Sequence, residues 1–189
     1  MKFNEKKAAH IAAFFIYCSG GSIHVLKLMK LMYLSERESF ARYGEPLTGD
    51  KPVSMRHGPV LSTTLDLINS FIPSVPEGWE YWISDRENHM LGLNIKVLST
   101  KELTQLSDAE LEILENIWNK YGGMDRYQLR DLTHKLCEEW EDPNGSSLAI
   151  PYSRILKCVG YSTEEAKELE NRINEKKQID DAFESVSTG

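Results

Sequence analysis

The segment IHVLKLMKLMYLSERESFARY, residues 23 to 43, constrains the fold more than any other part of the chain. Its apolar residues recur at the three- and four-residue spacing of an α-helix. Val25, Leu28, Met29 and Met32 mark a core face, and further leucines widen the apolar arc nearly all round. Such a helix is either central to the fold or covered on its second side by a partner.

The least apolar strip of this helix is cationic. Lys27, Lys30 and Arg37 lie along one side of it. The first interpretation is a solvated charged face, and the second is a contact strip for an acidic partner. Together with Tyr33, these side chains are therefore candidates for partner binding.

The composition is that of one soluble globular domain. The chain has 189 residues, of which 41% are hydrophobic and 27% charged. Its formal net charge of −7 makes it a poor general binder of nucleic acid or anionic membranes, although a local basic strip is compatible with this charge. No apolar run approaches the ~18 to 20 residues of a membrane span. Three widely spaced cysteines (Cys18, Cys137 and Cys158) predict buried free thiols and a cytoplasmic location.

The remaining patterns predict a compact, mainly α-helical α+β domain with a small antiparallel sheet of two to three short strands. We expect helices over 5–17, 23–43, 59–70, 108–121, 126–138, 151–159 and 163–183, a strand over 52–56 and a β-hairpin over 79–98. The hairpin is expected to pair with the 52–56 strand or to pack on helices. Ser22 is the expected cap of the second helix, and Ser107, Asp125 and Ser162 those of three later ones. Residues 5–160 form the predicted domain, and 161–189 a peripheral charged helix with a frayed tail.

The stretch SMRHGPV places Arg56 and His57 beside a glycine–proline corner. Gly58 permits a sharp turn, and Pro59 is expected to open the following helix. A helix N-terminus repels cations, so Arg56 and His57 are expected to pair with an acidic group. This group is either on a partner or internal, at Asp50. We interpret the corner as architecture first and as a docking contact second.

No group of residues predicts catalysis or a cofactor. His134 and Cys137 are a single pair, whereas zinc sites show two clusters of ligands. The chain has no nucleophile elbow and no glycine-rich phosphate loop, so we expect neither an enzyme nor a metal or cofactor. The helix pair at 108–138 resembles a helix-turn-helix, but its acidic residues make DNA binding the alternative function only.

Two stretches carry a family resemblance. The first is LKLMKLMYLSERESFARYGEPLTGDKPVSMRHGPVLSTTLDLI, and the second is YQLRDLTHKLCEEWEDP. Both resemble the signature of the Panacea domain, the SocA-like antitoxin family, over roughly residues 5 to 160. The motif positions expected to have structural roles are Tyr43, Gly44, Gly58, Pro59, Thr133, His134 and Trp140.

The resemblance implies a mainly helical α+β antitoxin of a bacterial or prophage toxin–antitoxin pair. Members neutralise toxins by direct binding, so the implied partner is a cognate protein toxin encoded adjacently. The SocA-type member delivers its toxin to an ATP-dependent protease, which makes such a protease a second candidate partner. A homo-oligomer is left open. Membrane and nucleic-acid partners are not expected.

Overall fold

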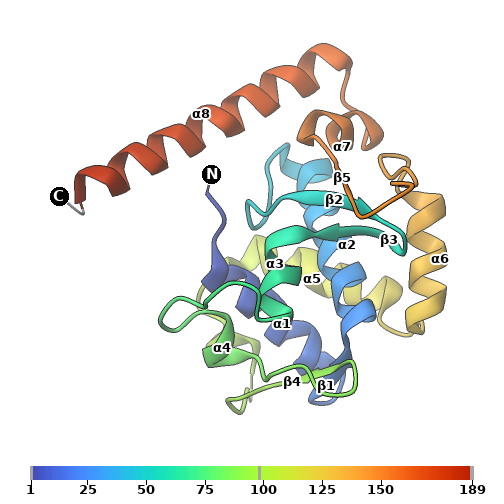
Figure 1. Ribbon diagram of the computed structural model, residues 1–189, viewed down its shortest axis with the longest axis vertical. Coiled ribbons are helices and arrows are strands. Elements are labelled where there is room, and N and C mark those ends of the chain that lie inside the picture. The colour runs from blue at the N-terminus through green and yellow to red at the C-terminus, as the bar shows by residue number, and fades with distance from the viewer. Residues whose placement is uncertain (1, 98, 188–189) are drawn as a thin grey trace.

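The computed structural model describes residues 2–97 and 99–187, without the side chains of 184–187. Figure 1 shows a mainly helical α+β fold, which confirms the predicted class. The elements are α1 (Glu5–Cys18), β1 (Ser22–His24), α2 (Val25–Tyr43), β2 (Pro52–Met55), β3 (Gly58–Leu61), α3 (Ser62–Ile68), α4 (Trp79–Trp82), β4 (Met90–Gly92), η1 (Thr100–Glu102), α5 (Asp108–Tyr121), α6 (Arg126–Leu136), β5 (Leu148–Ala149), α7 (Tyr152–Cys158) and α8 (Thr163–Ser187). The predicted fraying of the final residues concerns positions outside the described range.

Helix α2 is the centre of the domain. It packs against α1, α5, α6 and α7, and β3 crosses it (Figure 1). Leu28, Leu31 and Met32 are therefore almost completely buried. The first of the two predicted alternatives, a central helix, is confirmed. Ser22 is not its cap, because residues 22–24 form a strand and the His24 side chain accepts the Leu26 N–H instead.

The predicted helix over 59–70 is wrong in its first turn. Residues 58–61 form strand β3, which pairs antiparallel with β2, and the helix begins only at Ser62. Strand β3 is an edge of the β3–β2–β5 sheet. An edge strand tolerates proline, because the missing N–H of Pro59 can face away from the neighbouring strand.

The predicted hairpin over 79–98 is also different from the observed structure. Residues 79–82 form the short helix α4, which packs on α1. Strand β4 pairs with β1 rather than with β2, giving a second small sheet. Within the described part of 79–98, the expected hairpin is reduced to isolated bridges, from Ile83 to Leu93 and from Glu87 to Met90. The local alternation of apolar residues did not reveal this partner, since β1 lies far away in the sequence.

The predicted helix caps at Ser107, Asp125 and Ser162 are confirmed. The Ser107 hydroxyl accepts the Glu110 N–H, and the Glu110 carboxylate accepts the Ser107 N–H. The Asp125 carboxylate accepts two N–H groups at the start of α6. Such reciprocal bonds satisfy amides that the first helical turn leaves without partners.

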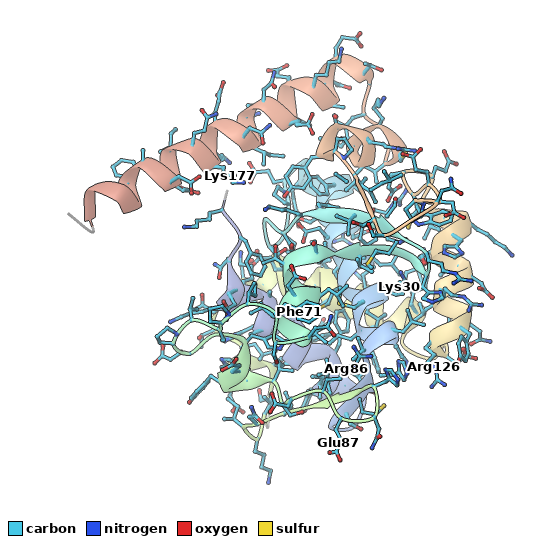
Figure 2. All side chains as sticks on the ribbon, in the orientation of Figure 1. Lys30, Phe71, Arg86, Glu87, Arg126 and Lys177 are labelled. Carbon is cyan, nitrogen blue, oxygen red and sulfur yellow. The ribbon has the colours of Figure 1, made fainter. Side chains whose placement is uncertain are left out.

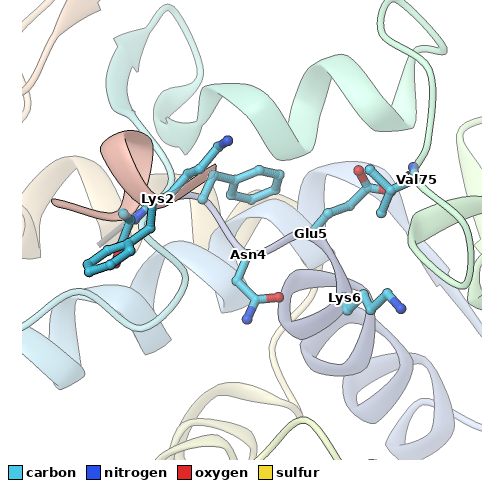
Figure 3. A pocket seen from close by; sticks show the side chains of 8 residues that line it. Lys2, Asn4, Glu5, Lys6 and Val75 are labelled. Carbon is cyan, nitrogen blue, oxygen red and sulfur yellow. Dashed lines mark hydrogen bonds between the residues drawn. The ribbon is translucent and has the colours of Figure 1, made fainter. Parts of the chain in front are cut away.

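Helix α8 extends away from the rest of the fold in Figure 1. Its first half packs on α7 through buried Ala166 and Ile173, whereas Ile179 and Phe183 are 55% and 71% exposed. Its far end, the N-terminal segment and Val75 border an open gap of about 810 Å³, and the Lys2 N–H donates a 3.3 Å hydrogen bond to the Asp180 carboxylate there. Figure 3 shows this gap, with the Glu5 carboxylate beside Val75.

Candidate functional site

The β2–β3 hairpin meets helix α2 through an unusually close contact. Gly58 has φ +93°, and a Cβ added to it would lie 2.9 Å from Lys30 Nζ. Lys30 is completely buried and donates a 2.7 Å hydrogen bond to the Pro59 carbonyl. Burial lowers the pKa of its ammonium to about 7, because the charged form is poorly solvated there. The glycine therefore makes room for a buried lysine that holds the hairpin on α2.

Helix α6 and the loop after it close the other side of this contact. Thr133 Oγ1 and His134 Cδ2 would lie 3.0 and 3.1 Å from a Cβ at Gly58. The His134 ring stacks on Trp140, with centroids 4.3 Å apart, and Trp140 donates its indole N–H to the Met55 carbonyl. We call the set Lys30, Gly58, Pro59, Thr133, His134 and Trp140 the motif junction. It joins the two sequence signatures in space.

A buried ion pair lies beside the motif junction. Glu139 is fully buried, and its Oε1 accepts hydrogen bonds of 3.0 Å from both Tyr33 Oη and Arg37 Nε. Arg37 also donates to the Cys158 carbonyl at the end of α7. Glu139 raises the pKa of the Arg37 guanidinium, although burial opposes this shift. The pair thus connects α2, the loop after α6, and α7.

The cations of α2 do not form the exposed strip that their spacing predicted. Lys30 and Tyr33 are completely buried, and Arg37 is paired with Glu139. Lys27 Nζ donates to the Gly122 carbonyl at 2.6 Å and lies over the Trp118 ring. The expectation of a solvated strip is wrong, because carbonyls and one buried carboxylate from distant segments receive these groups. Their predicted role in partner binding stays a prediction.

Arg56 and His57 form the two-residue turn between β2 and β3, since Met55 pairs with Gly58. They are exposed, and neither makes a hydrogen bond or ion pair within the described part of the chain. The prediction that they lie beside a helix N-terminus is wrong. The prediction that Asp50 is their internal partner is wrong as well. The buried Asp50 carboxylate instead accepts the N–H groups of Thr63 and Thr64 at the start of α3.

The turn forms one side of a pocket of about 530 Å³. Arg56, Arg86 and Arg126 line it, together with His24 and His89. Its floor is apolar and consists of Val25, Leu26, Met29, Val60 and Leu65. No aspartate or glutamate is among the described residues that line it. We call it the cationic pocket. Figure 2 shows Lys30, Arg86 and Arg126 on the same side of the fold, near the first turns of α2.

Comparison with protein-family models matches residues 28–141 to the Antitoxin SocA-like, Panacea domain. The chain belongs to this family. Neither the comparison with curated proteins nor that with solved structures finds a match. The matched range contains every residue of the motif junction. In this Panacea domain, two signatures about seventy residues apart in sequence are therefore brought together by the fold.

The other predicted motif residues have less central positions. Tyr43 is half exposed at the end of α2, and Gly44 ends this helix with φ +66°. A Cβ at Gly44 would lie 3.0 Å from Leu169 of α8, so the glycine permits close packing of a helix outside the matched range.

Two alternatives considered for the sequence find little support in the geometry. On α6, Arg130 forms an ion pair with Asp131, which reduces the positive charge available to phosphates. Among the described residues, no three His, Cys, Asp or Glu side chains lie close enough to hold a metal ion.

The three cysteines are free thiols, and only Cys137 is fully buried. No described helix is long and apolar enough to cross a membrane.

Sequence reasoning missed the buried carboxylates. Glu36 lies within α2 and accepts the Leu47 and Thr48 N–H groups, and burial raises its pKa to about 7. Glu139 follows another glutamate and resembles a solvated helix end in the sequence. A signal existed for Glu36 alone: it is an acid within the otherwise apolar arc of the central helix. Arg86 was missed because it lies in a polar turn with no local pattern.

Proposed function

We propose that this Panacea domain is the antitoxin of a toxin–antitoxin pair and neutralises its toxin by direct protein–protein binding. The observation that carries the proposal is the family match over residues 28–141. The proposal assigns no catalytic step to the chain. We also place it in the cytoplasm, which suits three cysteines that form no disulfide.

The exposed apolar side chains support a protein partner. Phe71 and Phe183 are 76% and 71% exposed, and Val75 and Tyr81 are about half exposed. Val75 and Phe183 border the same open gap beside α8, and Phe71 precedes Val75 in the same loop. Exposed aromatic residues supply most of the energy in many interfaces when a partner buries them. We assign the toxin contact to this side, around the loop 69–78 and the far end of α8.

The test is co-expression with the adjacent gene. The wild-type chain is expected to rescue growth and to co-purify with the neighbouring protein. Phe71→Ser should weaken both effects without unfolding the domain, because an exposed side chain contributes within about 0.5 kcal/mol to stability. Tyr127→Ser is the matched control, since Tyr127 is 51% exposed but lies at the cationic pocket.

An adjacent protein that is neither toxic nor bound would contradict the proposed function itself. Loss of rescue with Tyr127→Ser but not with Phe71→Ser would contradict only the assigned surface. Delivery of the toxin to an ATP-dependent protease belongs to the same proposal. It predicts that the toxin is degraded faster in cells that contain the antitoxin, as measured by its half-life after synthesis is stopped.

A further inference from the structure

The cationic pocket concentrates positive charge in a chain whose formal net charge is −7. Guanidinium groups stay charged at all ordinary pH values, so Arg56, Arg86 and Arg126 bring three full charges to one hollow. None of the three forms an ion pair with a carboxylate among the described residues, whereas four other arginines do: Arg37, Arg42, Arg130 and Arg154. Of the four arginines without an ion pair among the described residues, three therefore line this pocket, and the fourth, Arg172, lies exposed on α8.

Two of these guanidiniums have neutral hydrogen-bond partners, although the charge of Arg126 also acts on the neighbouring Asp125 carboxylate. Arg86 donates a 2.8 Å hydrogen bond to the Asn69 side chain and contacts the His89 ring. Arg126 lies 4.7 Å from the Tyr127 ring centre and donates to its hydroxyl. Neutral partners position a charge but do not cancel it. Such groups lose little freedom when an anion binds, which favours affinity.

The cations are also close enough to repel one another. Burial lowers the pKa of the His24 imidazole, and Arg126, His89 and Arg86 lower it further. The N-terminal end of α2 also lies at the pocket, and its helix dipole adds positive potential there, whereas the Asp125 carboxylate caps the N-terminal end of α6. A site that holds like charges together costs stability while it is empty, and an anion would relieve that cost.

The shape and the floor of the pocket narrow the class of anion. About 530 Å³ is the size of a small-molecule site, and the apolar floor suits a ligand with an apolar or aromatic part. The Tyr127 ring at the rim offers a stacking surface. Three guanidinium groups carry three positive charges, and a ligand with a single carboxylate would neutralise only one of them. Their planar arrays of N–H donors also match the oxygens of phosphate groups.

We propose that the cationic pocket binds a small molecule with two or more phosphates on an apolar or aromatic body, the class to which nucleoside di- and triphosphates belong. The guanidiniums of Arg56, Arg86 and Arg126 bind the phosphates. The floor between α2 and β3 receives the body. This site adjoins the surface assigned to the toxin at Asn69, which accepts from Arg86, but Phe71 does not line the pocket. The inference does not depend on the proposed antitoxin function.

The test is isothermal titration calorimetry on the full chain at about 0.15 M salt, where charges more than about 8 Å apart are largely screened. The ligands are inorganic pyrophosphate, ATP, GTP and adenosine, without divalent cations. ATP or GTP is expected to bind more tightly than pyrophosphate, and adenosine should not bind measurably. Arg86→Ala and Arg126→Ala should each weaken nucleotide binding about tenfold or more, the equivalent of about 1.4 kcal/mol.

Arg172→Ala is the matched control, because it removes the same charge from the exposed face of α8 and should leave the affinity unchanged. The proposal is overturned if no phosphate compound binds at about 1 mM, the level of about −4 kcal/mol. Equal affinities for pyrophosphate and the nucleotides would contradict the proposal that the ligand has an apolar or aromatic body. Unchanged nucleotide affinity in both arginine variants would contradict the proposal that this pocket is the binding site. A single-stranded oligonucleotide that binds more tightly than ATP or GTP would identify a nucleic-acid surface instead.

Since no toxin is present in these titrations, their failure leaves the proposed antitoxin function standing. Conversely, a failed growth rescue leaves the phosphate site standing. The variants separate the two in the same way: Phe71→Ser is expected to lose toxin binding but to retain nucleotide binding.

Discussion

The motif junction makes a sharp prediction for Gly58→Ala. Gly58 has φ +93°, a region where an L residue with a Cβ is strained by about 1–2 kcal/mol. The added methyl group would also lie 2.9 Å from Lys30 Nζ and 3.0 Å from Thr133 Oγ1. A lysine end can usually move aside, but this one is fully buried and hydrogen-bonded to the Pro59 carbonyl. Crowding in such a packed site costs about 1–3 kcal/mol more.

Gly58→Ala is therefore expected to lower the free energy of unfolding by about 2–5 kcal/mol, out of the roughly 5–15 kcal/mol that usually stabilises a domain. Gly20→Ala is the control that measures the contribution of backbone strain alone. Gly20 has a similar φ of +85°, and no described atom lies within 4 Å of its added Cβ. In this control, the free energy of unfolding should fall only by the backbone strain of about 1–2 kcal/mol.

Urea unfolding of both variants measures the difference. With a slope of about 1–3 kcal/mol per molar urea, the midpoint of Gly58→Ala should fall clearly below that of Gly20→Ala. Equal losses in the two variants would refute the reasoning, because they would show that the contact with Lys30 and Thr133 relaxes without cost.

Three further predictions concern the same region. Arg37→Met leaves the Glu139 carboxylate buried without a cation and should cost about 3–5 kcal/mol in urea unfolding, whereas a loss below about 1 kcal/mol would show that water reaches the carboxylate. Trp140→Phe removes the indole N–H that the Met55 carbonyl accepts, and we expect a loss of about 1–3 kcal/mol in the same assay. The third concerns pH. The pKa of Lys30 is about 7 in the folded protein against an ordinary 10.5, so between these values the unfolded chain binds more protons. Stability should therefore gain up to about 1.4 kcal/mol per pH unit from this group across that window, and Lys30→Met should remove the gain; parallel stability–pH curves for the two proteins would contradict it.

Local sequence determined the helices and their ends. The Ser107 and Asp125 caps depend on bonds between residues two or three positions apart, so their spacing is visible in the chain. The apolar arc of 23–43 likewise predicts a central helix, because helical periodicity decides which side chains share a face. The mainly helical α+β class and the family followed from these patterns and the two quoted motifs.

Tertiary structure alone decided the strand partners. Pro59 has the sequence context of a helix start, but pairing with β2 places it in an edge strand. Strand β4 joins β1 across more than sixty residues, while the nearer residues 79–82 become helical. Hydrogen bonds between distant segments outweighed local propensity in both places, and such pairings leave no short-range pattern.

The charged residues show the same division most clearly. The sequence placed Lys27, Lys30 and Arg37 on one side of a helix, which is correct, and interpreted that side as exposed, which is wrong. Each group reaches a partner from a distant segment: the Gly122 carbonyl, the Pro59 carbonyl and the Glu139 carboxylate. A lone chain cannot show that a cation is buried, because burial depends on which distant oxygen atoms the fold brings within hydrogen-bonding distance. The sequence determined which residues share a helix face. The packing of distant segments decided that these cations have internal partners, while Arg56, Arg86 and Arg126 line a pocket.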